Sequence, residues 1–232
     1  MGNGIFITGT DTGVGKTYLA KGIASRLSGR GIDVGVMKPV ETGCRMRMGR
    51  LMPADAAELL NAAEARDGLD IVNPYRFRRP LAPSVAAELE GRNIDPAKII
   101  SAFRILSERH EFMIVEGAGG IMVPICKDYL FLDLVLDLCL PVLIAARPGL
   151  GTINHTLLTV SALRGRGASV IGIVINHPAR ARQGLAEKTS PSVIERISGV
   201  PVLGIVPYNS SDFSDLADLL FAKSFFCRSR RW

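Results

Sequence analysis

The sequence predicts an α/β fold, in which a doubly wound, mostly parallel sheet carries helices on both faces. Short apolar runs without polar residues alternate with longer stretches of helical periodicity, which is typical of a buried parallel sheet. Hydrophobic residues make up 47% of the 232 residues and charged residues 22%, which excludes a disordered or fibrous chain. No repeat or linker interrupts the pattern. We therefore expect one domain over residues 1–223, followed by a basic, disordered tail over residues 224–232.

Six apolar runs are expected to form the strands, at residues 5–8, 34–37, 112–115, 141–146, 170–175 and 202–206. Helices are expected between them, at residues 16–27, 54–65, 96–109, 153–166 and 216–223. The first helix ends near Gly29 and Gly31, and the fourth ends at Gly167. Asp95 followed by Pro96 is an N-cap with proline at the first helical position, so it indicates where the third helix begins.

The formal net charge is +6, from 28 basic and 22 acidic residues. Four of the basic residues lie in the last ten positions, which contain no acid, so most of the excess charge belongs to the tail. We therefore expect neither nucleic acid nor a membrane surface as the partner, whereas anionic small molecules remain candidate ligands.

The most apolar window, residues 129–146, is interrupted by Asp133, Asp137 and Pro141, so it is not expected to span a bilayer. The first residues carry no signal-peptide pattern, and the four cysteines form no C-x-x-C pair. These features predict a cytoplasmic protein with reduced thiols.

The first predicted strand runs directly into residues 9–17 (GTDTGVGKT) and then into a helix. In this arrangement the backbone amides and the positive end of the helix face an anion. Lys16 adds a charge, and Thr17 offers a hydroxyl group to Mg²⁺. The strict phosphate-loop pattern requires glycine at position 10, where Thr10 stands. The loop nevertheless predicts nucleotide binding on a fold like that of the P-loop NTPases.

Other candidates follow the ends of neighbouring strands, where parallel sheets bind their ligands. Lys38 emerges beside the loop of Lys16, so we expect a second cation directed at phosphate. Glu116 ends a buried strand before four small residues, which suits a metal ligand close to phosphate, although loop amides could also satisfy it. Thr42 is either a turn hydroxyl or a substrate contact. For Asp55 the sequence favours a charge that complements a helix dipole.

Two further segments are candidates for binding. Residues 147–155 lead from a strand into a helix whose first amides would hold an anion, a carboxylate in particular, while His155 is expected to be structural. Asn176 ends another strand, where its amide can pair with a purine edge.

Together these segments resemble the dethiobiotin synthetase family. The resemblance is carried by residues 9–17, by Lys38-Pro39-Val40 and Asn73-Pro74-Tyr75, by residues 116–120 (EGAGG), and by Gly151-x-Ile153-Asn154-His155. It covers about residues 4 to 208 in the order and spacing of the family. It also accounts for Thr10, because the family has a variant phosphate loop of this form.

The resemblance implies an ATP-dependent enzyme that joins CO₂ to 7,8-diaminononanoate and forms the cyclic urea dethiobiotin, with ADP and phosphate as the other products. One amine becomes a carbamate, the carbamate takes the γ-phosphoryl group, and the second amine closes the ring. At about 4 Å and an effective dielectric near 20, a carbamate and a γ-phosphate repel by about 8 kcal/mol. A single lysine offsets this only marginally, whereas Lys16, Lys38 and Mg²⁺ together reverse its sign.

The resemblance also implies roles for individual residues. Lys38 is the catalytic lysine, Lys16 bridges the phosphates and the carbamate, and Thr42 contacts the diamine. The magnesium positions are Thr17, Asp55 and Glu116. The positions that bind the nucleotide are Thr12, Gly13, Val14, Gly15, Lys16, Thr17, Tyr18, Asp55, Glu116, Gly117, Ala118, Gly119, Asn176, Pro207, Tyr208 and Asn209. The family is a homodimer, in which a seat for the substrate carboxylate lies across the interface, at Gly151, Thr152, Ile153 and Asn154.

Some features depart from the family. Gly13 stands where glutamate is frequent, and the basic stretch 44–50 (CRMRMGR) matches no motif, so a mobile loop near the site is expected there. An alternative is a partitioning ATPase that is switched by its nucleotide. Such proteins carry a signature lysine early in the phosphate loop, where this chain has Asp11. An ATP-dependent amide ligase is a second alternative, but it needs a glutaminase domain that 232 residues cannot accommodate.

Overall fold

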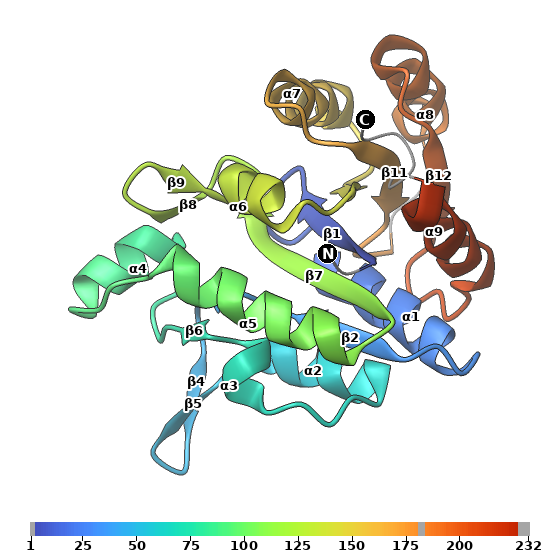
Figure 1. Ribbon diagram of the computed structural model, residues 1–232. Helices are drawn as coiled ribbons and strands as arrows, with labels where there is room; N and C mark the ends of the chain where they lie inside the picture. Colours follow the sequence, from blue (N-terminus) through green and yellow to red (C-terminus); the bar gives the residue numbers. More distant parts are fainter. Residues whose placement is uncertain (1–2, 181–183, 227–232) are drawn as a thin grey trace.

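Figure 1 shows the protein as a computed structural model that describes residues 3–180 and 184–226. Within these residues six strands form one central sheet, in the order β12-β11-β10-β1-β7-β2, and every neighbouring pair is parallel. The strands are β1 (Gly4–Gly9), β2 (Val34–Met37), β7 (Phe112–Gly120), β10 (Val142–Ala146), β11 (Val170–Asn176) and β12 (Val202–Val206). The predicted fold class is confirmed, and all six predicted strands are present.

Helices cover both faces of this sheet. In Figure 1, α5 (Pro96–Arg109) lies in front of β2, whereas α1 (Lys16–Ser28) lies behind β7. Both helices pack against β2 and β7. Helix α2 (Ala54–Ala63) packs against α1 and β2, α7 (Thr152–Gly165) packs against β10 and β11, and α9 (Ser214–Phe226) packs against α1 and β1. Strand β1 is buried along its whole length, because it lies in the middle of the sheet and is covered on both sides.

Several elements were not predicted from the sequence. They are the helices α3 (Leu69–Val72), α4 (Pro83–Leu89), α6 (Phe131–Leu138) and α8 (Leu185–Ser198), and two pairs of short strands, β3 (Val40–Glu41) with β6 (Tyr75–Arg76) and β8 (Pro124–Cys126) with β9 (Tyr129–Leu130). Helix α2 is two residues shorter than expected, because Glu64 turns into the left-handed region. In the described ranges no helix combines the length and the apolar character that crossing a bilayer requires.

The basic stretch 44–50 is not the loop that the sequence suggested. Strands β4 (Arg45–Arg47) and β5 (Arg50–Met52) form an antiparallel hairpin, which extends away from the central sheet in Figure 1. Met48 and Gly49 form its turn, and both have positive φ angles, as the tight turns of β-hairpins require. The hairpin joins β3 to α2 and so connects Thr42 to Asp55.

The C-terminal boundary also differs slightly from the expectation. Helix α9 continues to Phe226, three residues beyond the predicted end at residue 223. Residues 227–232 of the predicted tail lie outside the described residues. That residues 1–223 form a single domain stays a prediction.

Candidate active site

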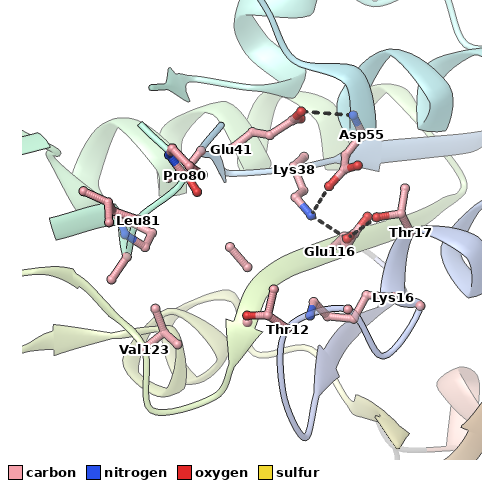
Figure 2. Close-up of a pocket in the computed structure, with 17 residues that line it drawn as sticks. Thr12, Lys16, Thr17, Lys38, Glu41, Asp55, Pro80, Leu81, Glu116 and Val123 are labelled. Carbon is pink, nitrogen blue, oxygen red and sulfur yellow. Dashed lines mark hydrogen bonds and ion pairs between the residues drawn. The ribbon is translucent and has the colours of Figure 1, made fainter. Parts of the chain in front are cut away.

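The carboxyl ends of β1, β2 and β7 surround a cavity of about 760 Å³ (Figure 2). Three segments that are far apart in the sequence meet here: the loop after β1, the end of β2 with the strand β3 that follows it, and the end of β7. The predicted site residues that line the cavity are Thr12, Gly13, Gly15, Lys16, Thr17, Lys38, Thr42, Asp55, Glu116, Ala118 and Gly119. The topology of the parallel sheet therefore brings together half of the residues that the sequence singled out, among them both lysines and all three magnesium candidates.

The loop after β1 has the geometry of an anion cradle. Gly13 and Gly15 have φ angles of 74° and 91°, which side chains with a Cβ rarely adopt. Helix α1 begins at Lys16 directly after Gly15, and no side chain in the described part of the protein caps its first turn. The backbone amides of this first turn, together with the positive end of the helix, are therefore available to a phosphate.

Lys16 is buried, and its Nζ donates a hydrogen bond to the backbone oxygen of Asp11 at 3.1 Å. Burial and the nearby charge of Lys38 lower the pKa of Lys16 from 10.5 to about 8. A lysine with this pKa is still mostly charged at neutral pH, and it lacks a carboxylate partner within ion-pair distance among the described residues. It can therefore serve an incoming anion.

Lys38 lies between two carboxylates (Figure 2). Its Nζ is 3.0 Å from Oδ2 of Asp55 and also forms a short ion pair with Oε1 of Glu116. Burial alone would lower the pKa of Lys38, but the charges of Glu116 and Asp55 outweigh burial and raise it. The ammonium group is thus charged. Asn73, which the family motif also contains, fixes the backbone here, because its Nδ2 donates to the carbonyl oxygen of Lys38 at 2.7 Å.

The acidic groups of the cavity fit a magnesium ion. Oε1 of Glu116 accepts a hydrogen bond from Oγ1 of Thr17 at 2.8 Å, whereas the buried Oε2 has no hydrogen-bond partner among the described residues. Glu116 is only 1% exposed, so an ion is a suitable partner for this oxygen. The described residues contain no cluster of three or more His, Cys, Asp or Glu side chains arranged for a metal. Mg²⁺ nevertheless fits, since it uses one or two carboxylates together with water and phosphate oxygens.

The predicted adenine side lies on the opposite flank of the phosphate loop. Asn176 is buried at the end of β11, and its Nδ2 donates to the carbonyl oxygen of Val14 at 2.9 Å. Its Oδ1 has no partner within the described part of the chain and is free to accept a hydrogen bond. The hydroxyl group of Tyr18 donates to the backbone of Ser210, which connects α1 to the turn containing Pro207, Tyr208 and Asn209. Neither Asn176 nor this turn lines the cavity itself.

The predicted carboxylate seat is separate from this cavity within one chain. Gly151, with φ 88°, precedes α7, which begins at Thr152. Residues 151–154 are not part of the cavity lining. The hydroxyl groups of Thr152 and Thr156 are buried, and they have no hydrogen-bond partner among the residues that the structure describes. Leu150, beside them, is 91% exposed.

Sequence analysis missed some residues that line the cavity. Glu41 is buried, and its two carboxylate oxygens accept hydrogen bonds from the backbone amides of Asp55 and Ala56. Burial raises the pKa of Glu41, and the two hydrogen bonds oppose this only in part. Its position directly before Thr42, four residues after the predicted strand 34–37, was the available signal. The apolar residues Pro80 to Pro83 and Val123 also line the cavity, and no motif marked them.

The fold and this cavity define the class of the protein, a P-loop ATPase. The family model described as an AAA domain matches residues 3–212. A ParA family ATPase from Chlorobium tepidum TLS has a similar fold, with a TM-score of 0.55 and 18% identity over 99% of this chain and 93% of that one. The cell division ATPase MinD of Pyrococcus furiosus has a TM-score of 0.53 and 17% identity over 97% and 99% of the two chains. At these identities the likeness concerns the fold alone.

Sequence relatives give a narrower assignment. The chain is 44% identical to the ATP-dependent dethiobiotin synthetase BioD of Thermodesulfovibrio yellowstonii over 90% of both chains, and 48% identical to that of Bacillus licheniformis over 88% of this chain and 85% of the relative. The identity to the synthetase of Methanocaldococcus jannaschii is 42%, over 87% of this chain and 92% of the relative. The chain belongs to the family of the ATP-dependent dethiobiotin synthetases, and the resemblance found in its motifs is confirmed.

Proposed function

We propose that this protein converts 7,8-diaminononanoate, CO₂ and ATP into dethiobiotin, ADP and phosphate, with Mg²⁺ as the metal. Membership of the synthetase family supports the reaction. The observation that carries it is that the Lys38 ammonium, held between Glu116 and Asp55, lies in the same cavity as Lys16 and the phosphate loop. This arrangement favours a reaction in which two anions meet.

The reaction has three steps. One amine of the diamine adds to CO₂ and loses a proton, which gives a carbamate. A carbamate oxygen then attacks the γ-phosphorus of ATP, the bond to the bridging oxygen breaks, and ADP leaves. The second amine finally attacks the carbonyl carbon of the mixed anhydride, phosphate leaves, and a proton is lost as the ring closes.

In our proposal the protein contributes charge and orientation more than acid–base chemistry. Lys38 and Lys16 both line the cavity beside the phosphate loop. Both therefore attract a carbamate and a γ-phosphate to the same place. We propose that the backbone amides of residues 12–17, among them those of Val14 and Thr17, hold the phosphates. The small residues Ala118 and Gly119 line the cavity beside them, whereas Gly117 packs against Phe6.

Thr17, Asp55 and Glu116 are the residues that we propose for magnesium. The unpartnered Oε2 of Glu116 supports this assignment. When bound, Mg²⁺ supplies positive charge to the phosphate oxygens on which negative charge accumulates.

The remaining contacts are proposed from the family. Asn176 and the turn Pro207-Tyr208-Asn209 would hold adenine, and Thr42 would contact the diamine. A homodimer would bring Gly151, Thr152, Ile153 and Asn154 of one chain to the cavity of the other. The separation of residues 151–154 from the cavity of their own chain supports this arrangement. We place the reaction in the cytoplasm, where ATP is available and cysteines such as the free Cys44 stay reduced.

ADP release by the purified protein, measured with and without diaminononanoate and bicarbonate, tests the proposal. We expect release that depends strictly on the diamine, dethiobiotin formed in an equal amount by mass spectrometry, and the mass of a dimer in sedimentation. ADP release at the same rate without the diamine would instead identify a nucleotide-switched ATPase.

A further inference from the structure

Glu41 makes contacts that neither the motifs nor the proposed roles explain. It ends β3 and is 6% exposed, and its carboxylate points toward the first turn of α2 (Figure 2). Oε1 accepts a hydrogen bond from the backbone amide of Asp55 at 3.0 Å, and Oε2 accepts one from the amide of Ala56, also at 3.0 Å. These amides belong to the second and third residues of the helix, which begins at Ala54. They are the two amides that an N-cap side chain normally binds.

Helix α2 has no cap of its own. The residue before its first turn is Pro53, whose side chain has no oxygen with which to accept a hydrogen bond. Glu41 therefore replaces the missing cap from a neighbouring strand. Its negative charge is also placed at the helix terminus that favours an anion. The backbone of Glu41 is itself fixed, because its carbonyl oxygen accepts a hydrogen bond from the amide of Phe77 at 2.9 Å.

The first turn of α2 carries Asp55. The side chain of Asp55 is 40% exposed, so packing alone restrains it weakly, and yet its Oδ2 lies 3.0 Å from the ammonium of Lys38. Its backbone nitrogen is the atom that Glu41 binds. We propose that Glu41 is a positioning residue, which holds the first turn of α2 in place so that the Asp55 carboxylate meets Lys38 and the metal. This inference rests on the proposed function, in which Asp55 is a magnesium ligand.

Two other roles for Glu41 are less consistent with its contacts. A metal ligand would need an oxygen directed at the ion, but both oxygens of Glu41 already bind backbone amides. A contact with an amine of the substrate is the second alternative, because Glu41 lines the cavity beside Thr42. The positioning role and the substrate contact predict different defects. Loss of positioning weakens the affinity for the metal, whereas loss of a substrate contact raises the KM for the diamine.

The test compares E41A and E41Q with a control, D95A. Asp95 caps α5 by accepting a hydrogen bond from the amide of Ala97 at 2.9 Å, and it does not line the cavity. D95A therefore removes a helix cap without touching Asp55. E41Q retains one oxygen acceptor of the same reach, so it should restore part of what E41A loses. Thermal unfolding of all three variants verifies that they are folded.

The first readout is Mn²⁺ binding to the protein loaded with a non-hydrolysable ATP analogue, followed by electron paramagnetic resonance. We expect the Kd for Mn²⁺ to rise about tenfold in E41A and by a smaller factor in E41Q, as is usual when the partner of a metal ligand is removed. D95A should bind Mn²⁺ like the unmodified protein. In turnover assays, excess Mg²⁺ should restore the kcat of E41A, with the KM for diaminononanoate unchanged.

Two results would overturn the inference. One is a folded E41A that binds Mn²⁺ as tightly as the unmodified protein, or no more weakly than D95A does. The other is a raised KM for the diamine with unchanged Mn²⁺ binding, which would make Glu41 a substrate contact. Because the Mn²⁺ titration needs no turnover, it remains informative even if the unmodified protein fails to form dethiobiotin.

Discussion

Replacing Lys38 with alanine removes the cation that two carboxylates share. In the structure its Nζ lies 3.0 Å from Oδ2 of Asp55 and forms a second, shorter ion pair with Glu116. At 3.0 Å and an effective dielectric near 20, Coulomb's law gives an attraction of about 5–6 kcal/mol for one pair. Solvent screens the attraction between Lys38 and Asp55, because the side chain of Asp55 is 40% exposed, whereas Glu116 is buried and its attraction to Lys38 is screened less. The variant therefore leaves a buried carboxylate without its cation, which typically destabilises a protein by about 3–5 kcal/mol.

The catalytic effect of the substitution should exceed its effect on nucleotide binding. ATP keeps the loop amides and Lys16, so we expect the Kd for ATP to change little. The step in which the carbamate meets the γ-phosphate loses one of its two lysines. Since one electrostatic donor is typically worth about 10²–10³ in kcat, we expect dethiobiotin formation to fall about a thousandfold. Adding Mg²⁺ with ATP should raise the melting temperature of Lys38→Ala more than that of the unmodified protein, because the ion supplies the missing partner.

The assay is ADP release under saturating diamine and bicarbonate, together with calorimetric ATP binding. Lys21→Ala is the matched control, since Lys21 forms an exposed ion pair with Glu58 at 2.6 Å and is absent from the cavity lining. A surface pair of this kind contributes about 0–1 kcal/mol, so this variant should retain both activity and stability. If Lys38→Ala turned over at the rate of Lys21→Ala, the reasoning about the shared cation would be wrong.

Two further predictions concern the edges of the sheet and the phosphate loop. Hydrogen bonds and charge from Asp33 and Asp67 outweigh burial and raise the pKa of His110 above 6.5. Its contribution to stability is therefore full below pH 6.5 and is lost as the pH rises through the folded-state pKa. Urea unfolding at several pH values should show this loss, and His110→Gln should remove it; equal pH profiles for the two proteins would contradict it. In the phosphate loop, a Cβ at Gly15 would lie 2.0 Å from Nδ2 of Asn176, whereas one at Gly13 would meet nothing within 4 Å. Gly15→Ala should thus weaken ATP binding in calorimetry much more than Gly13→Ala does, although both positions have positive φ.

The predicted site residues that the structure brings together are mainly those whose position follows from topology. Lys38 and Glu116 each end a strand of a parallel sheet, and the carboxyl ends of such strands meet at one edge. Asp55 was harder, because the sequence favoured a simple charge at a helix terminus. In the structure Asp55 lies in the first turn of α2 and also pairs with Lys38, and that second contact depends on where the helix is placed.

The elements that were missed lack a clear local pattern. Helix α6 is apolar around most of its circumference and largely buried, so its periodicity cannot be distinguished from that of a strand. Helix α8 contains Pro191, which argues against a helix when only local sequence is considered. The contact of Glu41 with α2 could not be predicted at all, because it requires a hairpin in a stretch that matched no motif.

The same hairpin explains how so much of the site comes from one short segment. The chain leaves β3 after Glu41 and Thr42, runs through β4 and β5, and returns to begin α2 at Ala54. Because two paired antiparallel strands bring their outer ends together, the hairpin returns the chain to the point where it left, and Glu41 meets the amide of Asp55. The position of Asp55 relative to Lys38 therefore depends on the hairpin's closure as well as on the central sheet. A long exposed connection beside an active site would otherwise leave this carboxylate free to move, and Glu41 is the contact that prevents it.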